Sequence, residues 1–215
     1  MKVQRNKNLK AQGFTLIEMI GVLAVIAILA ALLIPKIFNA INDARVNNAV
    51  VSYNTIKAAS AEHYAKYGAF DKTAGGAAVP ATPTSVPPPG GVAGMEYWDA
   101  QLLAEGFSDK LFLVKIGTNS FAKVTAGAGG PPLSFPVDSQ YNLDGVGTND
   151  VINGNWVVEA IIEGVAATDA KDVNDRLDGD TPPFVVVVGN ADTLGRVKYN
   201  PAVKGGELRI YATHR

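Results

Sequence analysis

Apolar and polar positions divide the chain into three parts: a long apolar stretch, an amphipathic stretch and a mixed remainder. From Phe14 to Ile34, the chain carries one charged side chain, that of Glu18. As an α-helix this stretch would be ~32 Å long, which matches the hydrocarbon thickness of a bilayer. The pattern therefore predicts a membrane-spanning helix over residues 14–35.

Beyond Pro35 the pattern becomes that of an amphipathic helix over residues 36–70. Residues of one stripe recur at spacings of three and four: Val46, Ala49, Tyr53, Ile56, Ser60, Tyr64 and Tyr67. We expect this stripe to pack on a globular head and Gly68 to end the helix. Pro35 removes a backbone donor and clashes with the preceding turn, which predicts a kink. An equal alternative is that Pro35 only marks where the helix leaves the membrane.

The head, residues 71–215, begins with an uncharged segment over residues 73–94 that is rich in proline and glycine. Such a composition is typical of an exposed loop. A short helix is predicted over residues 97–106, with three residues packing under the long helix: Trp98, Leu102 and Leu103. A strand is predicted from Leu111 over LFLVKIG, and a second loop rich in glycine and proline follows at residues 127–132.

The rest of the head has the pattern of a sheet with one helix. In WVVEAIIE, residues 156–163, alternation places both glutamates on the face opposite Trp156. A helix over residues 168–179 has Thr168 as its N-cap and Gly179 as its stop. Further strands are expected at residues 184–188, 197–199 and 207–212. The predicted fold class is α+β, with a long amino-terminal helix packed on an antiparallel sheet.

Charges set the orientation of the predicted helix and restrict the ligands of the head. The segment before it, residues 1–13, has four basic residues and no acid: Lys2, Arg5, Lys7 and Lys10. The positive-inside rule places this end in the cytoplasm and the head outside it. The head holds eleven bases and seventeen acids, a net charge near −6, which argues against nucleic-acid binding. The chain has no cysteine, so no disulfide stabilises the head.

The carboxylate of Glu18 requires a partner, because an isolated ionised acid in a bilayer costs at least ~2.5 kcal/mol. No cation of the intact chain lies within helical reach of it. An α-amino group at Phe14 would supply one, and that group exists only if the chain is cut after Gly13. The amine could pair with Glu18 of its own chain or with that of a neighbour, and the second arrangement implies polymerisation.

The residues GFTLIE, Gly13 to Glu18, resemble the class III signal of the type IV pilin superfamily, which includes pilins and pseudopilins. The resemblance implies that a prepilin peptidase cleaves after Gly13 and N-methylates Phe14, and that Glu18 is the assembly acid. Pro35 is similar to the helix proline of type IVa pilins. The implied fold is that of a pilin.

The resemblance implies a structural subunit of a type IV pilus, a helical homopolymer that other pilins join, serving adhesion, motility or DNA uptake. The implied partners are the prepilin peptidase and an inner-membrane assembly platform. The subunit would reside in the inner membrane before assembly and in an extracellular or periplasmic filament afterwards. Two alternatives stay open: a pseudopilin of a type II secretion system, and a membrane-anchored exported protein that does not polymerise.

Candidate chemistry in the head is sparse. The two histidines, His63 and His214, offer no evident metal pair or catalytic partner, so we expect no enzyme. Two acidic clusters are calcium candidates: Asp138, Asn142, Asp144 and Asp150, and Asp172, Asp175, Asp178 and Asp180. Neither cluster has EF-hand spacing, although major pseudopilins use a calcium-holding loop. We favour a solvated helix end and loop at these residues and expect no cofactor.

Overall fold

The computed structural model describes residues 13–70, 97–126, 141, 143, 156–179 and 195–214. The chain forms two compact units, Met1–Ile41 and Asn42–Arg215, and each is described here by itself. Helix α1 (Leu16–Tyr67) contributes to both units. The predicted strand at residues 184–188 and the loops at residues 73–94 and 127–132 lie outside the described residues.

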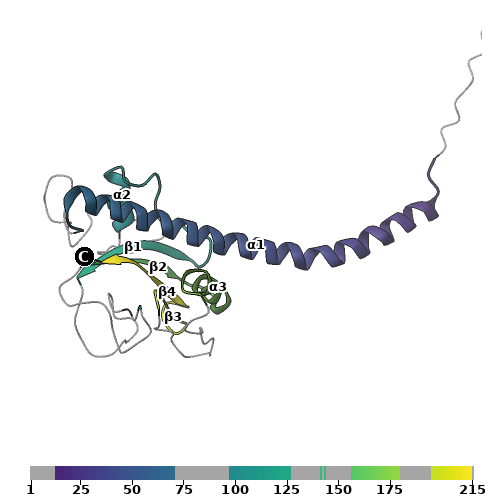
Figure 1. Cartoon of the computed structure of the whole chain (residues 1–215). Coiled ribbons are helices and arrows are strands. Elements are labelled where there is room, and N and C mark those ends of the chain that lie inside the picture. Colours follow the sequence, from purple (N-terminus) through teal and green to yellow (C-terminus); the bar gives the residue numbers. More distant parts are fainter. Residues whose placement is uncertain are drawn as a thin grey trace, which may run out of the picture. The chain divides into compact units, whose positions relative to one another are not determined.

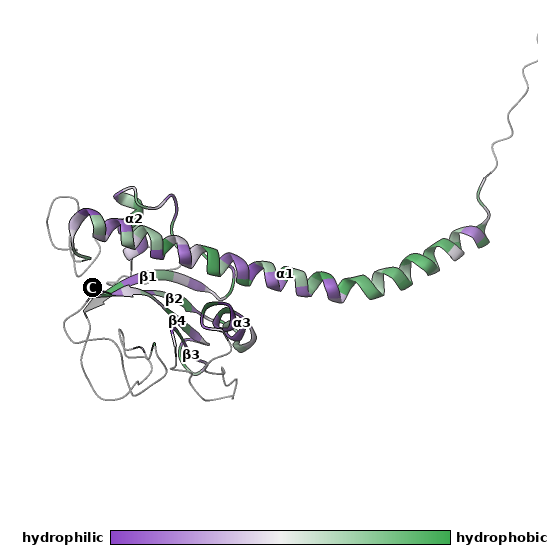
Figure 2. Ribbon diagram, in the orientation of Figure 1, coloured by the Kyte–Doolittle hydropathy of each residue, from purple (hydrophilic) through white to green (hydrophobic). Residues whose placement is uncertain are grey.

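In the first unit, the large apolar side chains of α1 are exposed from Leu16 to Ile41. Figure 2 shows this part of the helix as predominantly hydrophobic. An 18-residue window within α1 has a mean hydropathy of 2.8, and none of it is buried. By length and composition the helix can cross a membrane, as the sequence pattern predicts.

The second unit contains a four-stranded antiparallel sheet on which the second half of α1 packs (Figure 1). Its strands are β1 (Asn119–Ala126), β2 (Trp156–Glu163), β3 (Val197–Asn200) and β4 (Glu207–His214), in the spatial order β1-β2-β4-β3. Helices α2 (Trp98–Ala104) and α3 (Ala167–Leu177) complete the described elements. This is the predicted α+β, pilin-like architecture.

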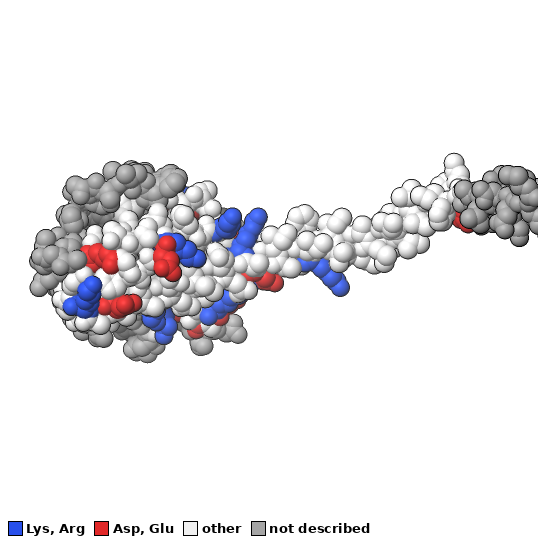
Figure 3. Space-filling view, turned by 90° about the horizontal axis from the view of Figure 1, so that it is seen from above, with Lys and Arg blue, Asp and Glu red and all other residues white. Residues whose placement is uncertain are grey.

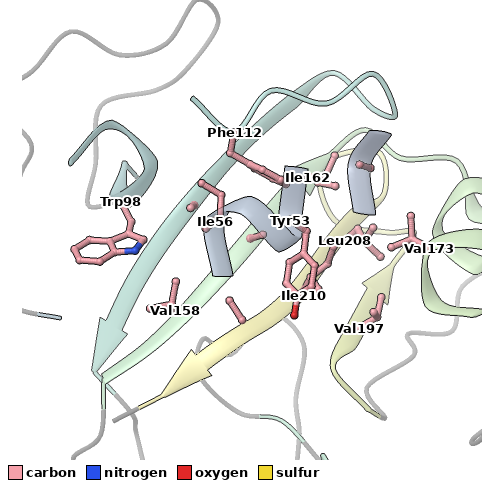
Figure 4. Packing of buried hydrophobic residues seen from close by; sticks show 14 of the residues in the cluster. Tyr53, Ile56, Trp98, Phe112, Val158, Ile162, Val173, Val197, Leu208 and Ile210 are labelled. Carbon is pink, nitrogen blue, oxygen red and sulfur yellow. The ribbon is translucent and has the colours of Figure 1, made fainter. Parts of the chain in front are cut away.

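The main core of the head lies between α1 and one face of the sheet (Figure 4). The buried residues of α1 are Val46, Ala49, Ser52, Tyr53, Ile56, Ala59, Ser60 and His63. They meet Val158, Ile162, Leu208 and Ile210 from the two central strands. The hydroxyl of Tyr53 donates to the carbonyl oxygen of Tyr211 at 2.7 Å, and burial raises its pKa to about 12. The predicted stripe is confirmed through Ser60, whereas Tyr64 and Tyr67 are only half-buried.

Helix α1 ends at Tyr67, and Gly68 follows with a φ of 72°, the left-handed conformation that commonly terminates helices. The N–H of Gly68 donates to the carbonyl oxygen of Tyr64 at 2.7 Å and completes the last turn. The expected stop signal is confirmed. Strand β2 has the predicted bounds, and β4 extends two residues beyond its expected end at Ala212.

Three local predictions are wrong. The segment LFLVKIG forms no strand; the strand of this region is β1, which begins at Asn119. Side chains satisfy the backbone of the segment instead: Asp99 accepts the N–H of Phe112, and the Ser120 hydroxyl donates to the Phe112 carbonyl oxygen. Leu103 is 38% exposed, because Trp98 and Leu102 alone of the three expected residues face the core.

The third error concerns the start of α3. The helix begins at Ala167 with Ala166 as its N-cap residue, and no side chain caps it. Thr168 therefore lies one residue inside the helix rather than at its cap. The N–H of Ala170 donates to the carbonyl oxygen of Ala166 at 3.0 Å, so the first helical hydrogen bond already excludes Thr168 as N-cap.

Candidate functional site: the start of the long helix

Helix α1 begins with a pair of side chains that cap it, Thr15 and Glu18. The backbone N–H and the hydroxyl of Thr15 both donate to Oε2 of Glu18, at 2.8 and 2.7 Å. The N–H of Glu18 lies 3.4 Å from the Thr15 hydroxyl oxygen, which accepts it. This reciprocal arrangement is a capping box, which satisfies two backbone donors that the first helical turn leaves without carbonyl partners. It also holds a negative charge at the positive end of the helix.

The capping box assigns Glu18 a role within its own chain that sequence reasoning missed. The signal was available, because Thr15 and Glu18 have the T-x-x-E spacing directly before an apolar run. A carboxylate offers about four lone-pair sites. Capping therefore leaves Glu18 with acceptor capacity for a further donor.

The predicted processing residues lie immediately before the helix. Gly13 and Phe14 are both exposed, and the Phe14 side chain is 84% exposed. Pro35, the other predicted assembly residue, lies inside α1, which continues without a break to Tyr67. The helix thus carries Glu18 at its first turn and Pro35 in its interior. Figure 3 shows few charged residues along this part of α1 and many on the head.

Of the residues proposed as calcium ligands, the structure describes only three, and two of them have other partners. Asp175 pairs with Lys171 one turn earlier in α3. Oδ2 of Asp178 accepts the N–H groups of Arg196 and Val197 at 2.8 and 2.9 Å, and burial raises its pKa. Among the residues that the structure describes, no three acidic or histidine side chains are placed to hold a metal. The other described candidate is Asp172; Asp138, Asn142, Asp144, Asp150 and Asp180 lie outside the described residues.

The two histidines lie in different environments. His63 is fully buried in α1, and its Nε2 is 3.3 Å from Oε2 of Glu105. His214 ends β4, where its Nδ1 is hydrogen-bonded to the hydroxyl of Tyr211. The two histidines contact different partners among the described residues.

The second face of the sheet carries buried charges that the sequence pattern did not indicate. Both glutamates of β2 lie on this face as expected, but Glu159 is fully buried rather than solvated. The Tyr141 hydroxyl donates to its Oε1 at 2.7 Å, and the Lys198 ammonium lies 4.1 Å from the centre of the Tyr141 ring. Arg209 pairs with Glu207 beside them. Alternation shows which face a residue occupies but not whether that face is covered, so these contacts could not be predicted.

Comparison with known proteins yields one match, and it falls on this helix start. Residues 8–34 match the model of the family described as "Prokaryotic N-terminal methylation motif". No curated protein and no solved structure matches the chain. The matched segment includes the capping box and most of the exposed apolar helix, and it is the class III signal of type IV pilins. This signal and the α+β head of pilin-like architecture together support a type IV pilin-like or pseudopilin protein.

Proposed function

We propose that this chain is a structural subunit of a type IV pilus, cleaved after Gly13, N-methylated at Phe14 and polymerised into a helical filament. The observation that carries the proposal is the methylation motif at the start of a helix whose apolar side chains are exposed. A prepilin peptidase would release the amine of Phe14. An inner-membrane platform would then transfer the subunit from the membrane into the filament, where other pilins could join it.

Helix packing and polar contacts, rather than removal of apolar surface from water, would drive the proposed assembly. From Phe14 to Ile41 the large apolar side chains are 44–84% exposed. Lipid covers such surface before assembly, and the helices of neighbouring copies would cover it afterwards. Because lipid is itself apolar, the gain must come from helix packing and polar contacts rather than from a hydrophobic difference. A specific polar contact is therefore important for register.

Glu18 supplies that contact in our proposal. The amine of Phe14 from an entering subunit would bind Glu18 of a subunit already in the filament. Breaking a buried ion pair by removing one partner costs about 3–5 kcal/mol, so a misplaced subunit would leave a charge unpaired at that cost. The capping box supports this role, because it holds the carboxylate at the helix start and uses only part of its acceptor capacity.

Glutamine at position 18 separates the two roles of Glu18. Glu18→Gln keeps an acceptor for the capping box but removes the charge. Thr15→Ala is the matched control, since it removes the hydroxyl of the box and keeps the charge. We expect Glu18→Gln to be inserted and processed normally but to form at least tenfold fewer filaments by electron microscopy, because a loss of 1.4 kcal/mol per contact already corresponds to tenfold. Thr15→Ala should form filaments close to the wild-type number.

The outcomes distinguish the competing interpretations. Wild-type numbers of filaments from Glu18→Gln would overturn the electrostatic role of Glu18. Loss of filaments from Thr15→Ala alone would instead identify helix capping as the requirement. Short periplasmic fibres in place of surface filaments would reassign the chain to the pseudopilins. A wild-type chain that is never shortened would identify a membrane-anchored exported protein.

A further inference from the structure

Helix α2 is attached to both α1 and strand β1 by buried polar side chains. On the α1 side, Nε1 of Trp98 donates to the hydroxyl oxygen of Ser60 at 2.8 Å. On the side of β1, the carboxylate of Asp99 accepts two backbone N–H groups, from Phe112 at 3.0 Å and from Ala122 at 3.1 Å. A helix of seven residues is too short to be stable alone. Its position therefore depends on these attachments.

A third attachment joins the carboxyl-terminal end of α2 to α1 and contains two titratable groups. Nε2 of His63 lies 3.3 Å from Oε2 of Glu105, and the two side chains are 0% and 6% exposed. The other oxygen of Glu105 accepts a hydrogen bond from Gln101. Glu105 is the C-cap residue of α2, so this contact fixes the end of that helix. A proton on the imidazole would place opposite charges at this contact.

Aromatic rings enclose the imidazole of His63 and keep water from it. The ring centres of Tyr67, Trp98 and Phe107 lie 4.8, 4.7 and 5.3 Å from the centre of His63, and all three pack edge to face with it. In such a site the effective dielectric constant is low, so opposite charges attract each other more strongly than they do in water. An imidazolium formed here would have a strong interaction with Glu105.

Other charged groups near this site are weaker or more distant partners. The ammonium of Lys66 lies 5.2 and 5.1 Å from the ring centres of Tyr67 and Phe107, and its charge opposes a second cation. Glu62 precedes His63 on α1 and is exposed. Asp99 is bonded to the backbone of β1 and of Phe112. Glu105, with Oε2 at 3.3 Å from Nε2, is a direct charged neighbour of His63.

We propose that α2 is a proton-sensitive clip: in mildly acidic surroundings a proton bound between His63 and Glu105 forms a buried ion pair that strengthens the attachment of α2 to α1. A folded state that holds this proton more firmly than the unfolded chain gains stability as the pH falls. Asp99 acts in the same direction, since burial raises its pKa to about 6. The contacts of Asp99 and of Glu105 would therefore both stabilise the folded head as the pH falls below neutrality.

The attachment of α2 lies next to the residues on either side of residues 71–96. Phe70 and Tyr97 flank residues 71–96, and both side chains are buried. The ring of Phe70 lies 6.1 Å from that of Trp98, the first residue of α2. The attachment of α2 thus holds its first residue, Trp98, close to Phe70. The clip lies within the head alone, so its action does not depend on polymerisation.

The full chain in detergent provides the test, with urea unfolding followed by tryptophan fluorescence at about pH 7.5 and about pH 5, the limits of histidine titration. We expect the urea midpoint of the wild type to rise on acidification. His63→Gln should lose at least about half of that rise, because the variant cannot bind the proton. His214→Gln is the matched control, since it removes the other histidine, and it should keep the wild-type rise.

Glu105→Gln and the double variant with His63→Gln sharpen the test. If the two residues share one proton, the double variant should lose no more of the rise than either single variant does. Should His63→Gln fail to fold, Glu105→Gln alone must lose at least about half of the rise, because the ion pair needs both partners. A rise in His63→Gln or Glu105→Gln equal to that of the wild type would overturn the proposal, as would additive losses in the double variant.

Discussion

The two halves of α1 belong to one helix but differ in what covers them. Before Asn42 the large apolar side chains are exposed, whereas after it eight residues are buried against the head. The second half thus finds its partner within the chain. The first half is as apolar as a protein core, but none of its residues belongs to a buried cluster of the described residues. The contrast indicates that one half of the helix belongs to the folded head, whereas the other half has the length and composition of a membrane span.

The largest expected effect comes from shortening the same side chain in each half. Ile56→Ala removes a side chain that is 1% exposed and should cost about 2–5 kcal/mol of head stability. Ile26→Ala, the matched control at a residue that is 54% exposed, should leave the urea midpoint of the head unchanged. Equal losses in both variants would show that the halves unfold as one unit and would remove the distinction between them.

Acidification should stabilise the head, on which the second half of α1 packs, through Asp99 of α2. Its pKa is about 6 in the folded head against 3.8 in the unfolded chain. Because the folded pKa is raised, the stabilisation is complete below the unfolded value and is lost as the pH rises through about 6. The difference between pH 4 and pH 7 should be on the order of 2–3 kcal/mol for this group. Asp99→Asn should abolish this part of the pH dependence in urea unfolding, and an unchanged pH profile would contradict the assignment.

A smaller effect is expected where α1 meets α2. Ser60→Ala removes the acceptor of the buried Trp98 N–H and should cost about 1–2 kcal/mol. Thr55→Ala is the control on the exposed face, where the hydroxyl donates to the carbonyl oxygen of Val51, and it should change stability by less than about 0.5 kcal/mol. Thermal unfolding of the two variants measures the difference, and a loss in Thr55→Ala that matched Ser60→Ala would argue against α2 as a selective attachment.

The smallest expected effect concerns the first docked turn of α1. Arg176 of α3 lies 3.1 Å from Asp43, with side chains 30% and 64% exposed. Exposed ion pairs contribute about 0.2–1 kcal/mol and are weakened by salt. Arg176→Ala should therefore lower head stability by that amount at low ionic strength and by less at high ionic strength. A loss that salt does not reduce would indicate that Arg176 acts through packing instead.

The sequence predicted the long helix and the central strands because their signals are local. The apolar run, the stripe from Val46 to Ser60 and the alternation in β2 each depend only on neighbouring residues. The position of strand β1 was predicted wrongly, because the preceding segment LFLVKIG is more apolar than the strand itself. Its conformation depends on Asp99 and Ser120, whose contacts with Phe112 join residues distant in sequence. No local pattern indicates such contacts.

At the candidate site, too, residues of a local motif were predicted and contacts between residues distant in sequence were not. Gly13, Phe14 and Glu18 were identified by a short motif, and they remain predictions as processing and assembly residues. The capping box was equally local and was missed, because Glu18 was considered only as a charge in need of a cation. The contact between His63 and Glu105 joins α1 to the end of α2 and could be found only in the folded head.

The most direct measurement of the central claim is the mass and amino-terminal sequence of the mature chain isolated from its source. Our account predicts a chain that lacks residues 1–13 and begins with N-methylated Phe14, with the amine ready to bind Glu18 of another copy. A functional mature protein that still begins with Met1 would contradict the account.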